Sequence, residues 1–402
     1  MSAATNSLWA RLRDVADATP PRRDRVVDST RAAAILVVIA WHWAGSVTHR
    51  DANGTFVMPN PIADVPCGWL ATWVLQVMPA FFVVGGFANL ASWNAVLRSG
   101  GGTAEFLRRR MARLLLPVAA WAAIWMTGEI IAVIVLSSHR WVWNWFPGVL
   151  IPLWFVAAYT AVTAAVPLTA RLHRRFGAAV VLGMGAGIAL LDALARGMDL
   201  SWAAWISAGM VWLFAHQLGY LWRTDGAALT TGRRVGIAAI GLSSLVLLTA
   251  LGYPRSMVAL PGDAESNMFP PNATIAALAV FQLGLILLAA PLAARLLHRR
   301  WVWRAVVAVN ATALTLFVWH MTAYVGFLWI FERLGGRLED EPTLQWWLQR
   351  PLWLLGPGLV LAALVTLFSR ADGTVALVGR VHGVTASGAQ IRRRVRARRR
   401  QS

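Results

Sequence analysis

Apolar runs about as long as a lipid bilayer is thick recur along the whole chain, and they constrain its fold more than any other feature. The hydrocarbon core of a bilayer is about 30 Å thick, and a helix needs roughly 20 residues to cross it. Since lipid offers no hydrogen-bond partners, each run has to satisfy its own backbone by forming a helix. We therefore predict an all-α polytopic membrane protein with about ten transmembrane helices. The predicted spans are residues 30–48, 69–91, 114–136, 149–170, 178–195, 201–222, 235–252, 273–294, 305–331 and 351–369.

Arginine carries all of the basic charge, and its distribution predicts the orientation of the chain. The formal net charge is +19, which in a soluble domain would suggest a nucleic-acid partner. Most of the 37 arginines, however, lie in the N-terminal arm, in the gaps after the second, fourth, sixth and eighth runs, and in the tail. The positive-inside rule places these segments, and therefore both termini, in the cytoplasm. We expect a multi-pass protein of the plasma membrane that contacts lipids and binds no nucleic acid.

Three regions follow from this pattern. Residues 1–28 form a basic cytoplasmic arm, 29–370 form the ten-helix membrane domain, and 371–402 form an arginine-rich cytoplasmic tail suited to anionic lipid. In the arm, apolar residues recur at helical spacing beside arginines, which favours a short amphipathic helix on the inner leaflet, with a solvated arm as the alternative. The single Cys67 excludes an intramolecular disulfide, and no cysteine cluster suggests a metal site. The sequence leaves the oligomeric state open.

The first predicted span carries a basic residue and a histidine on one face. Arg31 and His42 are eleven residues apart, which is three helical turns, about 16 Å along the axis and within roughly 20° of the same direction. Because ionisable side chains are costly in lipid, both should face other helices or a cavity. Two interpretations remain open at this point. The pair is either an interfacial anchor with a packed core histidine, or a site that carries chemistry.

A second pair of basic residues lies before the third span. Arg110 and Arg113 are i, i+3 neighbours at the foot of that helix, so their planar guanidinium groups are spaced to grip one phosphate together. The alternative is ordinary positive-inside charge. The preceding span contains Pro79 and the paired glycines Gly85 and Gly86, which permit close contact with another helix.

Taken in order, these features resemble the integral-membrane acyltransferase 3 family. The resemblance rests on Arg31 and His42 with ten residues between them, on the segment Phe81-Phe-Val-Val-Gly-Gly-Phe87, and on the Arg110-x-x-Arg113 gap before a Leu-Pro helix. It continues more weakly to the segments around Trp154 and around Trp319-His320. Two departures stand out. Gly85 replaces the usual serine of the second span, and no glutamate follows the tryptophan of the fourth.

The resemblance implies an acyltransferase whose donor is cytoplasmic acyl-CoA, with no permanently bound cofactor. The transferred group is expected to be acetyl or another short acyl chain, and the acceptor a hydroxyl of an envelope glycolipid, glycan or secreted metabolite. Within this scheme His42 is the general base, since a neutral imidazole can take the proton of an attacking hydroxyl. Arg31, Arg110 and Arg113 would hold the phosphates of the donor.

Two further ionisable residues are predicted at a depth similar to that of His42. Glu129 on the third span and His320 on the ninth are catalytic candidates that could orient His42 or line the acceptor path. The alternative for His320 is a hydrogen-bonded core histidine. We interpret His216 as structural, and likewise the pair Asp192 and Arg196, which are spaced i, i+4.

Two other function classes compete with acyl transfer. A lipid or small-molecule transporter or flippase would also need a polar cavity, but proton-coupled carriers usually display several intramembrane carboxylates, and Glu129 is almost alone. A purely structural membrane protein leaves the stripe of Arg31 and His42 unexplained. Acylation of an added acceptor by the purified protein would distinguish the three.

Overall fold

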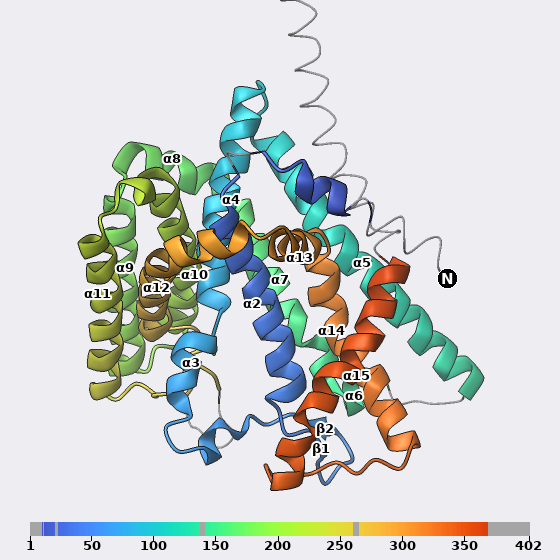
Figure 1. Cartoon of the computed structure of the whole chain (residues 1–402). Coiled ribbons are helices and arrows are strands. Elements are labelled where there is room, and N and C mark those ends of the chain that lie inside the picture. The colour runs from blue at the N-terminus through green and yellow to red at the C-terminus, as the bar shows by residue number, and fades with distance from the viewer. Residues whose placement is uncertain (1–9, 11, 21–22, 137–140, 260–264, 369–402) are drawn as a thin grey trace, which may run out of the picture.

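The computed structural model describes residues 10, 12–20, 23–136, 141–259 and 265–368, and these are almost entirely helical (Figure 1). The described strands, β1 (His49–Arg50) and β2 (Phe56–Val57), form one short antiparallel ribbon. The prediction of an all-α polytopic membrane protein is confirmed. The helices are α2 (Arg25–Ala44), α3 (Trp69–Leu75), α4 (Met78–Arg98), α5 (Thr103–Leu136), α6 (Val142–Trp145), α7 (Ile151–Ala164), α8 (Val166–Phe176), α9 (Ala179–Met198), α10 (Ser201–Asp225), α11 (Thr231–Ala250), α12 (Ala273–Leu297), α13 (Arg300–Ala311), α14 (Ala313–Arg333) and α15 (Leu344–Phe368).

Within the described part of the chain, 9 segments are long and apolar enough to cross a membrane. The sixth predicted span, which corresponds to α10, is not among them. This helix has 25 residues but carries the polar side chains His216 and Gln217, both fully buried. It packs against α4, α9 and α12, so its surface meets protein on several sides and does not need to be uniformly apolar.

Three of the predicted spans are interrupted in the structure. The second divides into α3 and α4 because Pro79, which lacks a backbone N–H, occupies the first turn of α4. The fourth divides into α7 and α8, again with a proline, Pro167, in the first turn of the new helix. The ninth divides at Thr312 into α13 and α14. Hydropathy alone does not separate these pieces, because both sides of each break are apolar.

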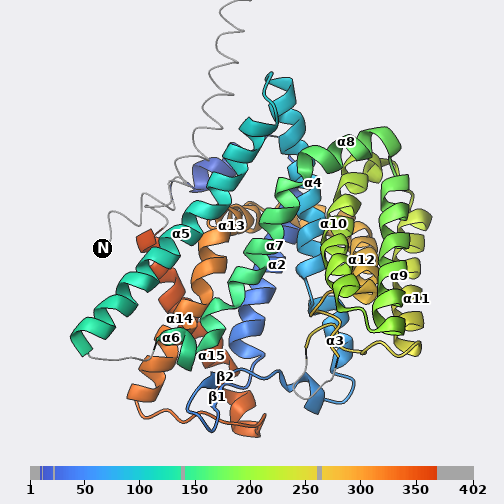
Figure 2. The same cartoon turned by 180° about the vertical axis from the view of Figure 1, so that it is seen from behind.

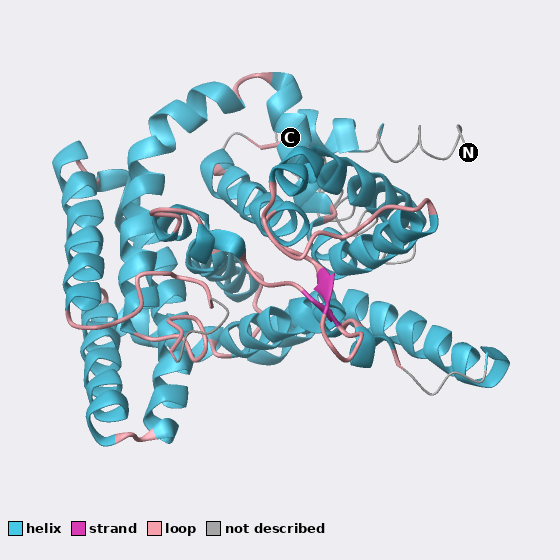
Figure 3. Ribbon diagram, turned by 90° about the horizontal axis from the view of Figure 1, so that it is seen from below, coloured by secondary structure: helices cyan, strands magenta, loops and turns pink. Residues whose placement is uncertain are grey.

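The helix α2 occupies the middle of the molecule. It contacts α4, α12, α13, α14 and α15, whereas α9 and α11 lie together at one side and the long α5 slants along the other (Figures 1 and 2). The short β ribbon lies at one end of the bundle (Figure 1), and seen from that end it lies near the middle of the molecule (Figure 3). The stripe of polar residues on α2 therefore faces other helices, as the cost of charge in lipid requires.

Glycines bring α4 and α10 into close contact. A Cβ atom added at Gly86 would lie 1.9 Å from the carbonyl oxygen of His216, and one added at Gly219 would lie 1.9 Å from that of Val83. Neither position has room for a side chain. The close helix contact predicted from the paired glycines is thus confirmed, and it fixes the spacing of the two helices.

One face of the described part of the N-terminal arm packs on α13, whereas Arg13, Asp14 and Asp17 are exposed. Ala16 is buried there, and the indole N–H of Trp303 lies 3.2 Å from the Ala16 carbonyl oxygen. The guanidinium of Arg304 donates to Asp17 at 2.7 Å and lowers the pKa of that carboxyl. The arginine-rich tail lies outside the described residues.

The cytoplasmic location of both termini stays a prediction, and reporter fusions test it. A reporter that is active only outside the cytoplasm should be silent when it is fused after Gln401. It should be active when it is inserted after Gly336, in the loop between α14 and α15. The opposite pattern would place the arginine cluster described below on the outer side of the membrane.

Candidate functional site

His42 and His320 meet in the interior of the bundle. The Nδ1 atom of His42 lies 2.8 Å from the Nε2 atom of His320, and the two rings are inclined by only 13°. His320 is fully buried on α14, and His42 is half-buried near the end of α2. Of the two residues predicted to orient His42, the structure brings His320 to it.

The hydrogen-bond network assigns the protons of this pair. The Nδ1 atom of His320 lies 2.6 Å from the carbonyl oxygen of Phe317, and a carbonyl oxygen only accepts. His320 Nδ1 therefore carries its proton, which leaves Nε2 of the neutral ring as an acceptor for the Nδ1–H of His42. The Nε2 atom of a neutral His42 is then unprotonated, and among the described residues no hydrogen bond occupies it. His42 is thus held in the tautomer that a general base requires.

Local structure places the two histidines. The carboxylate of Asp24 accepts from the backbone N–H groups of Val26 and Val27 and so starts α2, which then runs unbroken to Ala44. On the facing helix, the His320 carbonyl oxygen accepts from the indole N–H of Trp43 at 3.0 Å. Two bonds from neighbouring residues of α2 therefore fix its register against α14.

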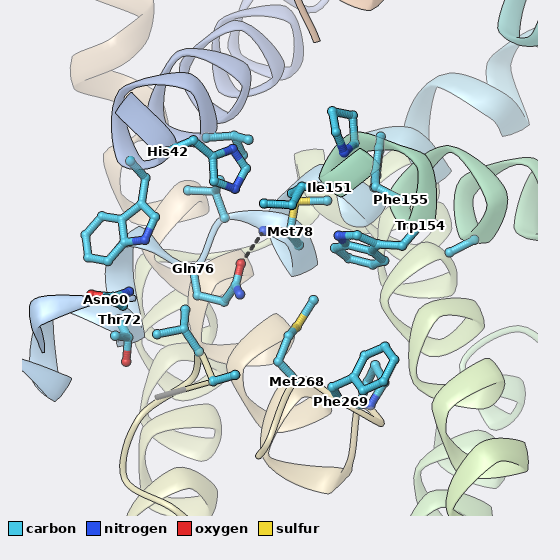
Figure 4. Close-up of a pocket in the computed structure, with 18 of the residues that line it drawn as sticks. His42, Asn60, Thr72, Gln76, Met78, Ile151, Trp154, Phe155, Met268 and Phe269 are labelled. Carbon is cyan, nitrogen blue, oxygen red and sulfur yellow. Dashed lines mark hydrogen bonds between the residues drawn. The ribbon is translucent and has the colours of Figure 1, made fainter. Parts of the chain in front are cut away.

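His42 lines a cavity of about 890 Å³ between α2, α3, α4, α7 and α10 (Figure 4). In the figure, His42 lies at one end of the cavity, Gln76 in the middle, and Met268 and Phe269 at the opposite end, with Trp154 along the side. A volume of this size accommodates a small-molecule substrate. The unprotonated nitrogen of His42 is therefore accessible to a bound hydroxyl.

The predicted donor residues form a second group, toward the start of α2. The positive charge of Arg31 acts on both Arg110 and Arg113, which shows that the three guanidinium groups lie near one another. Asp28 lies 3.9 Å from Arg31 but is also paired with Arg23. Among the described residues Arg110 and Arg113 form no ion pair. The group has more positive than negative charge.

Arg110 is the least satisfied member of this group. One of its Nη atoms donates to the Ala88 carbonyl oxygen at 3.3 Å, but its buried Nε has no hydrogen-bond partner. A buried donor without an acceptor is costly, and a phosphate oxygen would remove that cost. The cluster of Arg31, Arg110 and Arg113 therefore has the charge and the free donors of an anion site.

Glu129 does not join the histidines. Its carboxylate is buried and accepts a hydrogen bond from the backbone N–H of Val142 at 3.0 Å, so it ties α5 to the start of α6. It makes no hydrogen bond with either histidine and does not line the described cavity. The geometry gives it a structural contact, and a catalytic role for Glu129 stays an untested prediction.

Sequence reasoning missed most of the cavity wall. Trp205, Gly209 and Trp212 lie on α10, a helix that carries no recognisable motif, and Gln76 lies at the break between α3 and α4. The only sequence signal for this wall was the recurrence of tryptophan on one face of α10. The same pattern is typical of a helix that is anchored at the membrane interface. Among the described residues no group of three His, Cys, Asp or Glu side chains could hold a metal ion.

Comparison with known proteins supports the resemblance found in the sequence. No curated protein and no solved structure matches the chain. The family model of the acyltransferase 3 group, described as an acyltransferase domain, matches residues 24–371. That range contains both histidines and all three arginines of the cluster, together with every helix from α2 to α15. The chain therefore belongs to the acyltransferase 3 family and is a membrane acyltransferase.

Proposed function

We propose that this protein transfers an acetyl or other short acyl group from cytoplasmic acyl-CoA to a hydroxyl of an acceptor on the outer side of the membrane. The acceptor would be an envelope glycolipid, a glycan or a secreted metabolite. One observation carries the proposal. His42 presents an unprotonated Nε2 to a large cavity while His320 holds its other nitrogen.

The proposed step needs no group beyond donor, acceptor and His42. The acceptor hydroxyl gives its proton to His42 Nε2 as its oxygen bonds to the thioester carbonyl carbon. The carbon–sulfur bond then breaks, and the proton on His42 passes to the departing thiolate of CoA. The products are an ester and free CoA, and His42 returns to its neutral state. His320 accepts the Nδ1–H of His42 throughout and stabilises the cation that forms transiently.

The separation of the two sites fits the shape of the donor. The phosphates of CoA cannot cross the hydrocarbon, because charge there is costly, so they would stay at Arg31, Arg110 and Arg113. Only the uncharged arm and its thioester would extend toward His42, about 16 Å further along α2. An acceptor would reach His42 through the cavity. Neither substrate then crosses the membrane completely.

The buried carboxylates do not favour proton-coupled transport. Asp28 is paired with Arg23, and Glu129 accepts from the Val142 N–H. Asp192 accepts from the Ser207 hydroxyl and from a backbone N–H at the start of α12. Each of these carboxylates makes a contact that holds the bundle together, so no buried carboxylate among the described residues is free for a proton relay.

Substitution of the arginine cluster tests donor binding. We expect Arg110→Ala and Arg113→Ala each to raise the KM for acyl-CoA by about tenfold, because each removes a charge-assisted contact with phosphate. The KM for the acceptor should change little. Lysine at either position should restore donor binding only in part, since it lacks the planar fork. Initial rates at varied acyl-CoA, measured by release of free thiol, give these constants.

Arg108→Ala is the matched control. Arg108 lies on the same helix and is exposed. Its loss should leave the donor KM unchanged. If all three alanine variants fold and show wild-type donor kinetics, Arg110 and Arg113 serve only to orient the chain in the membrane.

A further inference from the structure

The cavity beside His42 has an uncharged wall that is mostly aromatic and aliphatic. Among the described residues that line it, none is Asp, Glu or Arg, and the chain has no lysine. Trp41, Trp154, Trp205 and Trp212 contribute indole rings, and most of the remaining wall is aliphatic or phenyl. Such a surface favours an uncharged ligand, because nothing in it compensates the desolvation of a charge.

Two of the polar side chains in the wall, Thr72 and Gln76, are already hydrogen-bonded within the protein. The Thr72 hydroxyl donates to the Trp69 carbonyl oxygen at 2.6 Å and accepts from the Met257 N–H at 2.9 Å. Gln76 donates to the Met257 carbonyl oxygen, and its own oxygen lies 3.3 Å from the Met78 N–H. These groups hold α3 against the loop that precedes α12, so they have little capacity left for a ligand.

This shortage of partners matters for polyhydroxylated acceptors. Each sugar hydroxyl that enters the cavity loses its hydrogen bonds to water, and each one left without a partner weakens binding. Besides His42 Nε2, the wall offers a ligand the Ser46 hydroxyl and the Asn60 side chain, whose oxygen already accepts from the Ile62 N–H. The wall therefore suits a molecule with one reactive hydroxyl and an otherwise apolar body.

Three aromatic side chains of the cavity wall are exposed on the outside of the protein. The Trp154 ring belongs to a membrane-spanning segment, yet it is 39% exposed, and Trp205 is 56% exposed. Phe269 is 67% exposed and packs edge-on against Trp205, with ring centroids 5.5 Å apart. In a membrane, exposed rings on a spanning segment meet lipid. The exposed rings on α7 and α10 thus form an apolar surface beside the cavity, and the membrane around such a surface concentrates apolar alcohols.

We propose that the acceptor is an uncharged, largely apolar alcohol that partitions into the membrane and enters the cavity laterally between α7 and α10. The proposal rests on acyl transfer as proposed above and narrows its acceptor class. It selects lipid-like or apolar metabolite acceptors over anionic lipids and free glycans. The volume of about 890 Å³ accommodates both the apolar body and a short acyl group beside His42.

Three probes with eight-carbon chains test the acceptor class with the purified full-length protein in nanodiscs. Dioctanoylglycerol is uncharged with one hydroxyl, dioctanoylphosphatidylglycerol is anionic, and octyl glucoside is uncharged but polyhydroxylated. Binding is measured by the change in tryptophan fluorescence, and transfer by acetyl-CoA-dependent release of thiol. We expect dioctanoylglycerol to bind, and to be acetylated, at least about tenfold better than either of the others.

Filling the cavity gives a matched pair of variants. A Cβ added at Gly209, which lines the cavity, or at Gly183, which lies on α9 away from it, would meet no atom within 4 Å. Leucine should fold at both helical positions, since it favours helix over glycine. Gly209→Leu should lower the acceptor kcat/KM by about tenfold and leave the donor KM unchanged. Gly183→Leu should leave both unchanged.

The outcomes separate the two proposals. Equal or better binding of phosphatidylglycerol or octyl glucoside, no binding of dioctanoylglycerol, or wild-type kinetics of Gly209→Leu would each overturn the assignment of the acceptor class. Release of thiol with any acceptor would then still support acyl transfer. Selective binding of dioctanoylglycerol without transfer to any acceptor would instead refute the proposed function while upholding the chemical preference of the cavity.

Discussion

Replacing His42 with alanine should lower kcat by about two to four orders of magnitude, which is the usual contribution of a positioned acid–base group. The physical reason is the position of its Nε2 atom, which is unprotonated, open to the cavity and backed by His320. Acyl-CoA should still bind, because the arginine cluster lies about 16 Å away along α2. The loss should therefore appear in kcat and not in the donor KM. Steady-state rates of thiol release with the acceptor saturating provide the measurement.

Two companion variants make this result interpretable. His42→Gln retains a side chain that can donate to His320 Nε2, but it offers no basic nitrogen to the acceptor, so it should be as inactive as His42→Ala. His298→Ala removes an exposed histidine at the end of α12, and it should retain full activity. A correctly folded His42→Ala protein that acylates its acceptor at the wild-type rate would exclude His42 as the base. Glu129 would then be the next residue to test.

The part of this site that lies on one helix was predictable from sequence. Arg31 and His42 share a face of α2 because that helix is uninterrupted from Arg25 to Ala44, so the eleven-residue spacing translates directly into direction and distance. Arg110 and Arg113 likewise lie within one turn of α5. Helical geometry relates such residues without any knowledge of the tertiary fold.

The contact between His42 and His320 was not predictable in the same way. The two residues are separated by 278 positions, and only the packing of α14 on α2 brings them together. The sequence places Glu129 and His320 at similar depths in the membrane, so depth alone does not show which of them contacts His42. Only His320 contacts His42, because the Glu129 carboxylate instead accepts a hydrogen bond from the backbone N–H of Val142. A sequence pattern does not reveal which backbone donor a carboxylate will find.

Spacing along a helix also indicates the wrong partner when a residue from another part of the fold makes a more favourable contact. Asp192 and Arg196 are spaced for an i, i+4 ion pair, but the structure gives them different hydrogen-bond partners. Asp192 accepts from Ser207 and from the N–H of Ala273, and Arg196 donates to Glu265. A buried carboxylate gains more from two short hydrogen bonds than from a flexible surface pair, which contributes little. The expectation that both residues are structural is consistent with these contacts.

Removing His320 should produce the second largest loss of activity, and the loss should follow from the tautomer of His42. His320→Ala leaves the Nδ1–H of His42 without its acceptor at a fully buried position. His42 is then free to move its proton to Nε2 or to rotate, and either change removes the base from the cavity. Because His320 acts through His42 and does not touch the substrate, we expect kcat to fall by about ten- to a thousandfold, less than for His42→Ala.

The same variants separate a positioning role for His320 from a purely structural one. The side-chain oxygen of glutamine can accept from His42 Nδ1–H, so His320→Gln should recover a substantial part of kcat, whereas His320→Ala should not. Both variants should keep the wild-type KM for acyl-CoA, because the arginine cluster is untouched. The double variant His42→Ala/His320→Ala should be no worse than His42→Ala alone, since a positioning residue contributes nothing once its base is gone. If His320→Ala and His320→Gln lose activity equally and in proportion to their loss of thermal stability, His320 is a core residue whose hydrogen bond to His42 has no part in the reaction.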